Sequence, residues 1–376
     1  MEVLIIPDSF KGSLSAIEVA HLMEQSVKAV FPQSNCTVMP FSDGGEGALT
    51  VLQTHSKGSL VMCSTNDALF RPIEAPYFLF QNQKEAWIEL SQTAGLTQLK
   101  NTALQPLEAS TWGTGKMIKH ALENGCEKIY LGLGGSATQD LGTGIIAALG
   151  GRFLDQNGKE LPPGGGALTH LTKIDLSQLN PKASRAQWIL ACDVTNPLLG
   201  KNGTAHTYAK QKGASADAIA QLEQGGIQFA KIVETQIGIK IKNLKGGGAA
   251  GGVSAGLYAT LNAHLTGGFE LLAQLTGLKD TLSKFDLILT GEGSFDEQSL
   301  QGKLPIQVAS LAKKHNIPIR ILAGRSSIES LENFPQCKII PTTPAGSSLK
   351  SALQNAEKNL QTALHKELKL IQSKRL

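Results

Sequence analysis

Short apolar runs that alternate with helical stretches stand at both ends of this chain, and they constrain its fold more than any other feature. Two runs lie near the N-terminus, at residues 3–7 and 37–41. Three more lie near the C-terminus, at residues 286–290, 317–323 and 338–341. Each has the length of one strand, and strands that alternate with helices pair in parallel. The pattern predicts a parallel sheet of five strands with helices on both faces.

The middle of the chain follows a different pattern. Runs at residues 59–64, 72–80 and 86–90 stand close together without helices between them, which favours antiparallel strands. Runs at 129–133 and 188–191 are then separated by helical or glycine-rich segments. This middle region is therefore expected to hold mixed strands.

The two patterns divide the chain into two domains, a number that suits its 376 residues. We predict an α/β protein whose outer domain, residues 1–57 plus 283–376, is a discontinuous Rossmann-like or flavodoxin-like parallel sheet. An α/β domain with mixed strands, residues 58–282, is inserted into it. The active site is expected in the cleft between the two domains, where two substrates can meet.

Composition excludes several classes of protein. Charged residues make up 18% and the net charge is +4, so no strong field favours nucleic acid or a membrane surface. Aromatic residues, at 5%, are too few for platforms that stack bases. Five cysteines stand far apart without a CxxC pair, which is typical of reduced thiols in the cytoplasm. With no basic leader and no apolar run of ~18 residues, we expect a cytoplasmic protein without a membrane span.

Polar loops follow four of the strands predicted for the outer domain, at residues 8–13, 42–47, 291–297 and 324–327. Because the carboxyl ends of parallel strands meet at one edge of a sheet, we expect these loops to converge. Their glycines let backbone N–H groups approach phosphate oxygens, and their carboxylates can hold Mg²⁺. Their lysines and arginine can neutralise a transferring phosphoryl group. The loops therefore predict a site for phosphoryl transfer.

Three further loops belong to the inserted domain, at residues 132–140, 192–198 and 246–252. The P-loop signature of many nucleotide-binding proteins is absent from the chain, which excludes a P-loop enzyme.

One of these loops supports a competing interpretation. Gly132-x-Gly134-x-x-Ala137 follows a strand and is expected to open a helix over residues 137–149, which makes it a dinucleotide-binding fingerprint when taken alone. Together with Ser136, Thr138 and Asp140, the same loop equally suits a nucleotide or a phosphate.

Long motifs in this chain resemble those of the type 1 glycerate kinase family. They are PDSFKGSLSAIEVA at 7–20, SDGGEG at 42–47, EASTWGTGKMI at 108–118, GLGGSATQD at 132–140, CDVTNPLLG at 192–200, GGGAAGG at 246–252 and GEGSFDEQSLQGKLP at 291–305. The chain departs from the family's usual Asn-Asp-Gly-Gly at residues 139–142, where it reads QDLG. The resemblance implies a two-domain α/β enzyme that phosphorylates D-glycerate with ATP and Mg²⁺.

The loops and the resemblance together suggest roles for individual residues. The residues expected to be catalytic are Asp193, Asp296, Lys11 and Lys303, with one of the two acids nearest the attacking hydroxyl. Those expected to bind substrate are Asp8, Ser9, Ser13, Asn196 and Arg325, the last by a bidentate contact with the glycerate carboxylate. Those expected to bind nucleotide or phosphate are Gly44, Gly45, Gly134, Gly135, Ser136, Gly291 and Gly293. Asp43 and Glu292 are the candidate Mg²⁺ ligands.

Two other functions stay open at this point. The first is a nicotinamide-dependent oxidoreductase built on residues 132–137, and the second is a non-catalytic sensor of a phosphorylated metabolite. The partners expected are small molecules, glycerate and ATP, rather than nucleic acid or membrane. A homo-oligomer, and transfer to either the 2- or the 3-hydroxyl of glycerate, are both compatible with the sequence.

Overall fold

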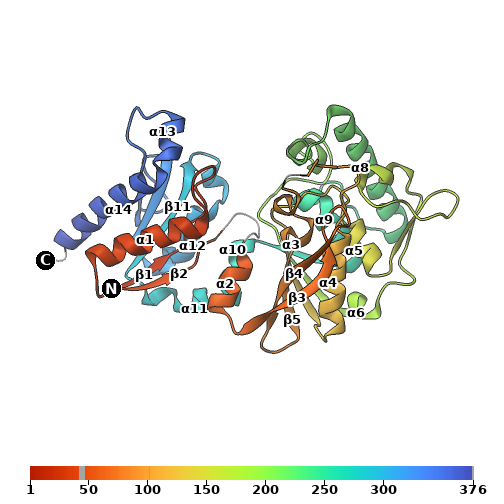
Figure 1. The fold of residues 1–376 in the computed structure, drawn as a ribbon, viewed down its shortest axis with the longest axis horizontal. Helices are drawn as coiled ribbons and strands as arrows, with labels where there is room; N and C mark the ends of the chain where they lie inside the picture. The colour runs from red at the N-terminus through yellow and green to blue at the C-terminus, as the bar shows by residue number, and fades with distance from the viewer. Residues whose placement is uncertain (42–46, 101, 375–376) are drawn as a thin grey trace. The chain divides into compact units, whose positions relative to one another are not determined.

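A computed structural model describes residues 1–41, 47–100 and 102–374 (Figure 1). The chain forms two compact units: unit 1 comprises Met1–Asp43 with Leu272–Leu376, and unit 2 comprises Gly44–Leu271. The sequence placed these boundaries near residues 57 and 282. The first boundary lies earlier because helix α2 (Ala48–His55) contacts strands of unit 2.

Unit 1 is built on a five-stranded sheet in which every neighbouring pair is parallel, which confirms the sheet that the sequence predicts. Its strands are β1 (Glu2–Ile5), β2 (Asn35–Val38), β11 (Leu287–Phe295), β12 (Ile319–Ser326) and β13 (Cys337–Pro341). The spatial order is β13-β12-β11-β1-β2. The chain winds in opposite directions from β1 and from β11, so the topological switch point of this flavodoxin-like sheet lies between them.

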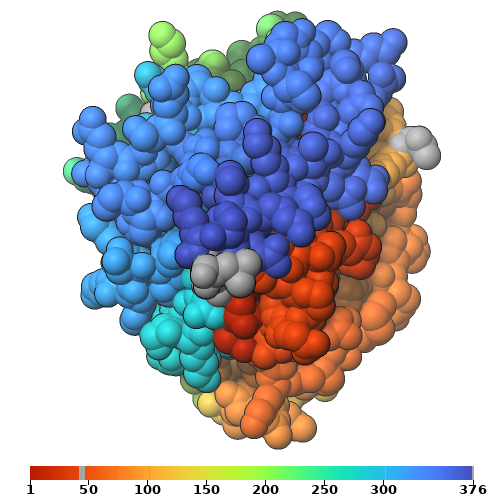
Figure 2. Space-filling model, turned by 90° about the vertical axis from the view of Figure 1, so that its left-hand side faces the viewer, coloured from red at the N-terminus to blue at the C-terminus, as the bar shows by residue number. Residues whose placement is uncertain are grey.

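Helices cover both faces of this sheet. On one face α1 and α14 lie side by side (Figure 2). Val27, Leu364 and Leu289 share one core there. On the other face Ile288 and Ile321 are fully buried and α12 contacts β11. The helices are α1 (Ala16–Val30), α11 (Leu278–Thr281), α12 (Leu304–Ala312), α13 (Leu349–Gln354) and α14 (Ala356–Ser373).

Local sequence signals set the bounds of several of these helices. A capping box starts α1, because the Ser15 hydroxyl accepts from the Glu18 N–H at 3.3 Å and the Glu18 carboxylate accepts from the Ser15 N–H at 2.7 Å. Ser348 caps α13 through the Ser351 N–H at 3.2 Å. The spacing of leucines and alanines over residues 347–366 favours one helix, whereas the structure has two, which meet at Asn355.

Unit 2 contains a mixed six-stranded sheet in the order β10-β9-β6-β5-β4-β3. The pairs from β10 to β5 are parallel, whereas β5-β4 and β4-β3 are antiparallel, as the sequence predicts. The strands are β3 (Gly58–Asn66), β4 (Pro72–Phe80), β5 (Glu85–Glu89), β6 (Lys128–Gly132), β9 (Gln187–Ala191) and β10 (His264–Thr266). A separate two-stranded sheet pairs β7 (Arg152–Leu154) with β8 (Lys173–Asp175).

Helices of very different length pack around the mixed sheet. They are α3 (Ser91–Ala94), α4 (Trp112–Glu123), α5 (Thr143–Ala148), α6 (Pro181–Arg185), α7 (Thr204–Tyr208), α8 (Ala216–Ile237) and α9 (Ala249–Leu261), with α10 (Gly268–Leu275) at the border of the units. Short 3₁₀ turns join them, among which η4 (Lys210–Lys212) concerns the site below. Among the described residues, no helix combines the length and the apolar character needed to cross a bilayer.

The helix expected over residues 137–149 begins only at Thr143, so that prediction is wrong for its first half. Leu141 and Gly142 adopt positive φ values of 54° and 76°, which a right-handed helix does not allow. The loop that starts at Gly132 therefore runs through an irregular segment before α5 begins. The dinucleotide fingerprint lacks the helix that would receive a pyrophosphate, which removes the structural basis of the oxidoreductase interpretation.

Candidate active site

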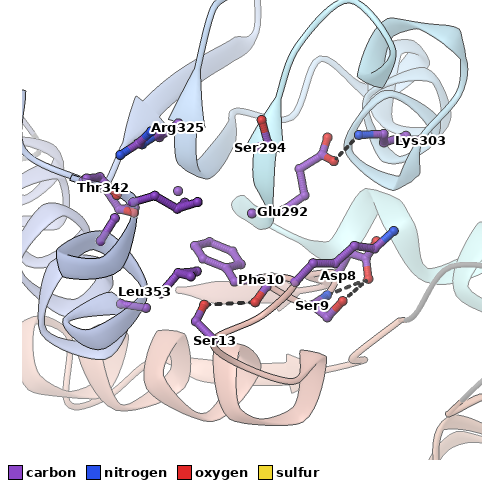
Figure 3. Close-up of a pocket in the computed structure, with 17 residues that line it drawn as sticks. Asp8, Ser9, Phe10, Ser13, Glu292, Ser294, Lys303, Arg325, Thr342 and Leu353 are labelled. Carbon is purple, nitrogen blue, oxygen red and sulfur yellow. Dashed lines mark hydrogen bonds and ion pairs between the residues drawn. The ribbon is translucent and has the colours of Figure 1, made fainter. Parts of the chain in front are cut away.

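The carboxyl ends of β1, β11, β12 and β13 surround one cavity of about 340 Å³ in unit 1 (Figure 3). It adjoins the switch point between β1 and β11, the position at which open parallel sheets bind ligands. Its polar lining consists of Asp8, Ser9, Lys11, Ser13, Glu292, Ser294, Lys303, Arg325, Thr342 and Thr343. Phe10, Gly293, Gly324, Leu349, Ala352, Leu353 and Ala356 complete it. Three of the four loops expected to converge thus do so, and Asp43, Gly44 and Gly45 of the fourth lie outside the described residues.

A lysine and a carboxylate form an ion pair on the cavity wall. The Lys303 Nζ donates to the Glu292 Oε2 at 3.0 Å and to the Ser299 Oγ at 3.2 Å. The Glu292 side chain is 6% exposed and that of Lys303 is 30% exposed. Lys303 immediately precedes α12, whose first turn carries a proline with no N–H to satisfy. The lysine charge and the positive end of the helix dipole together favour an anion at this place.

Asp8 is held in place by the sheet. Its backbone N–H donates to the Gly291 carbonyl at 2.9 Å, and the Thr290 hydroxyl donates to the Ile6 carbonyl at 2.8 Å, so the pairing of β1 with β11 continues into the site. The Asp8 carboxylate is buried and accepts from the Ser9 N–H at 2.5 Å and the Ser9 Oγ at 3.2 Å. These contacts fix its position on the cavity wall.

The glycines at the end of β11 are explained by close backbone contacts. A Cβ at Gly293 would lie 3.1 Å from the Lys11 backbone nitrogen, so glycine allows the loop after β1 to approach β11. A Cβ at Gly291 would lie 2.2 Å from the Leu322 carbonyl oxygen, and Gly291 does not line the cavity. Its phosphate-binding role stays a prediction, while its packing role is evident.

Asp296, one of the two acids expected near the reacting hydroxyl, does not line the cavity. Its Oδ1 accepts from the Gln298 N–H at 2.9 Å and from the Ser299 N–H at 3.2 Å. This is the geometry of an aspartate that closes a turn. This turn also positions Ser299, whose hydroxyl accepts a hydrogen bond from the Lys303 Nζ.

The other expected acid, Asp193, lies in unit 2 on the loop after β9. Its side chain is exposed, and its Oδ1 accepts from the N–H of Gly268, the first residue of α10, at 2.8 Å. Asn196 on the same loop accepts from the Tyr208 Oη at 2.7 Å and donates to the Asn202 carbonyl at 3.0 Å. The amide of Asn196 therefore organises its own loop, and its predicted contact with substrate stays untested.

Sequence reasoning missed a buried lysine beneath the loop of Gly134, Gly135 and Ser136. The Lys212 Nζ donates to the Ser136 Oγ and to the Thr138 carbonyl, each at 2.8 Å. Lys212 is only 2% exposed, and this burial lowers its pKa to about 7. The negative charge of Asp140 acts in the opposite direction and raises the pKa. The signal that could have found it is a lysine beside a glycine, in the QKGA segment at residues 211–214.

Asp140 is the buried carboxylate whose charge raises the pKa of Lys212. Its Oδ2 accepts from the Thr111 N–H at 2.7 Å, the Thr111 hydroxyl at 2.9 Å and the Gly144 N–H at 3.2 Å. Its Oδ1 accepts from the Gly142 N–H at 3.2 Å. Burial raises the pKa of this carboxyl, and these hydrogen bonds oppose the shift. Asp140 thus ties the start of α4 to the start of α5.

The fold and the site define a class of protein. A flavodoxin-like sheet with a lysine–carboxylate pair, a helix N-terminus and further cations at its switch point belongs to an α/β enzyme that acts on anionic small molecules.

The chain belongs to the glycerate kinase family, whose model matches residues 3–372. A glycerate kinase from Halalkalibacterium halodurans is 37% identical over 363 residues, which cover 96% of this chain and 96% of that protein. A glycerate 2-kinase from Escherichia coli is 38% identical over 324 residues, 86% of this chain and 85% of that protein. The crystal structure of a glycerate kinase 2 candidate from Salmonella typhimurium LT2 has a TM-score of 0.82 at 36% identity and covers 100% of this chain and 99% of that one. These findings confirm the family, the α/β fold and the class of enzyme that the sequence predicts.

Proposed function

We propose that this enzyme transfers the γ-phosphoryl group of ATP to a hydroxyl of D-glycerate, giving a phosphoglycerate and ADP. The observation that carries the phosphoryl chemistry is the cavity of unit 1, where the Lys303–Glu292 pair, Lys11 and Asp8 lie at the switch point of the sheet. Family membership supports glycerate as the acceptor. Of the two hydroxyls we favour position 2, because the similar Escherichia coli protein is a glycerate 2-kinase.

In this reaction the glycerate hydroxyl oxygen forms a bond to the γ-phosphorus, the bond from that phosphorus to the bridging oxygen of ADP breaks, and the hydroxyl proton leaves to a base. Lys303 and Lys11 would neutralise charge on the transferring group. The ion pair with Glu292 holds the Lys303 ammonium at the cavity wall before an anion arrives, which reduces the reorganisation needed during the reaction. For the base we favour Asp193, whose side chain is exposed, over Asp296, whose carboxylate closes a turn.

Mg²⁺ fits the donor set of the cavity, because this ion binds one or two carboxylates together with phosphate oxygens. Glu292 would supply one carboxylate, and Asp8 lies on the same wall. Asp43, the other ligand that the sequence suggests, lies outside the described residues. When bound, the ion would neutralise the phosphate oxygens of ATP.

The test is an assay of ADP release by the purified protein with ATP, Mg²⁺ and D-glycerate, followed by phosphorus NMR of the product. We expect ADP only when D-glycerate is present, and a resonance of 2-phosphoglycerate. ADP release that is independent of glycerate, or none with it, would overturn the proposed reaction. A resonance of 3-phosphoglycerate would overturn the choice of hydroxyl alone.

A further inference from the structure

The cavity of unit 1 has two chemically different ends (Figure 3). Glu292, Lys303 and Asp8 lie at one end, and Arg325 and Leu353 lie at the other. The first end is charged and suits phosphate groups. The second end is largely apolar, and the transfer of a phosphoryl group does not by itself require an apolar surface there.

The apolar end presents two exposed leucines on the wall of the cavity. Leu349 and Leu353 are 62% and 37% exposed, and both line the cavity. They stand four residues apart on α13, so they share one face of that helix. Ala352 and Ala356 line the cavity beside them and are buried. Exposed apolar side chains at the mouth of a cavity with a few polar groups mark a place where a ligand provides the missing contact.

Glycerate does not match this end. Each of its carbons carries a hydroxyl or carboxylate oxygen, so it has no apolar surface to cover Leu349 and Leu353. The cavity volume of about 340 Å³ also falls in the range of roughly 300–1,000 Å³ that holds ligands much larger than a three-carbon acid.

A purine base does match it. Its faces are apolar and flat, and its edge carries hydrogen-bonding atoms. The exposed Arg325 guanidinium, which donates to the Ser347 carbonyl at 2.8 Å, is a planar cation of the kind that stacks on such rings. Thr342 and Thr343 also line the cavity, and their backbone N–H groups donate to the carbonyls of Ala323 and Gly324 at 2.7 and 3.1 Å, which holds them beside β12.

We propose that the α13 end of this cavity binds the purine base of the nucleotide, and that the phosphate chain runs from there toward Lys303. The inference rests on the proposed function and assigns a place in the chain to the nucleotide. Arg325, expected from the sequence to hold the glycerate carboxylate, contacts the nucleotide instead. Ser13, whose hydroxyl donates to the Phe10 carbonyl at 2.9 Å, shapes the loop between the two ends.

The experiment compares Leu349→Ser, Leu353→Ser and their double variant with Ile17→Ser as a matched control. Ile17 is an equally apolar side chain on α1, 55% exposed, that does not line the cavity. Calorimetric titration with ADP and with adenosine measures base binding independently of turnover, and steady-state kinetics give separate KM values for ATP and glycerate. Thermal unfolding of each variant verifies that it is folded.

We expect the double variant to bind ADP and adenosine about tenfold more weakly and to raise the KM for ATP similarly, because apolar contact area is lost. The KM for glycerate should change less than about twofold, and Ile17→Ser should match the wild type. Unchanged adenosine binding in the double variant, or a rise confined to the KM for glycerate, would overturn the inference. If the wild type forms no ADP with glycerate but the double variant loses adenosine binding, the base site is supported and the proposed reaction is refuted. The inference and the proposed function can therefore fail separately.

Discussion

The cavity of unit 1 and the buried loop of unit 2 both bring a lysine near a carboxylate, but in opposite surroundings. Lys303 is 30% exposed and contacts Glu292 at 3.0 Å on the wall of a cavity. Lys212 is 2% exposed and donates to Ser136 and to the Thr138 carbonyl. An ammonium at a cavity can exchange its partner for an incoming anion, whereas a buried ammonium is held by the atoms around it. We therefore expect a lysine to serve anion recognition in unit 1, whereas a lysine holds a loop in unit 2.

The two lysines also differ in the free energy that it costs to keep them charged. A buried charge loses hydration and is tolerated only when hydrogen bonds and an opposite charge replace the water. Lys212 receives two hydrogen-bonding partners and the field of Asp140, yet its pKa is still lowered to about 7. The predictions below test whether the two lysines differ in this way, beginning with the largest effect.

Replacing Lys303 by Met should lower kcat by about 10²–10³-fold, because a cation aimed at the transferring group is removed. The melting temperature should fall as well, because the Glu292 side chain is 6% exposed and loses its opposite charge. Kinetics under saturating ATP and glycerate give the answer, with Lys314→Met, an exposed lysine outside the cavity lining, as the control. Near-normal turnover in Lys303→Met would remove this lysine from the catalytic group.

Replacing Asp140 by Asn should destabilise the fold by about 2–3 kcal/mol. Both carboxylate oxygens accept backbone N–H groups, so the amide nitrogen of Asn would face a donor and leave it unsatisfied. Urea unfolding measures the loss. Asp217→Asn, at an exposed position in the first turn of α8, should cost less than about 1 kcal/mol. Equal unfolding midpoints for the two variants would contradict the structural role of Asp140.

Replacing Lys212 by Met should remove a pH dependence of stability. The pKa is about 7 in the folded protein and 10.5 as the reference value, so between these pH values the unfolded chain binds a proton that the folded chain does not. Stability of the wild type relative to Lys212→Met should therefore rise with pH in this window, by at most about 1.4 kcal/mol per pH unit. Unfolding titrations from about pH 6 to about pH 10 follow the difference, and a difference that stays flat would refute the lowered pKa of Lys212.

Replacing Asp296 by Ala should have the smallest effect, a loss of about 1 kcal/mol from the turn that its carboxylate closes. Turnover should fall no more than a few-fold, through the displaced Ser299 that contacts Lys303. Denaturant unfolding and kcat are measured on the same preparation. A fall in kcat of several orders of magnitude would return Asp296 to the catalytic residues.

Much of the cavity of unit 1 was predictable from local sequence. Asp8 and Arg325 stand at the ends of β-branched runs, and parallel strands bring such ends to one edge. Lys303 could be placed there because it follows the β11 segment closely and opens a helix. The start of α5 could not be predicted, because it depends on Asp140 accepting N–H groups in place of a helix turn.

The sequence by itself determined the five parallel strands, the insertion, the positions of the polar strand ends and, through its motifs, the family, because these depend on short-range periodicity and on contiguous residues. Only the tertiary structure decided that Lys212 lies under Ser136, 76 residues away, and that the leucines of α13 line the same cavity as Lys303. The physical reason is that burial and contact between distant segments follow from packing, and neither is encoded in the spacing of neighbouring residues.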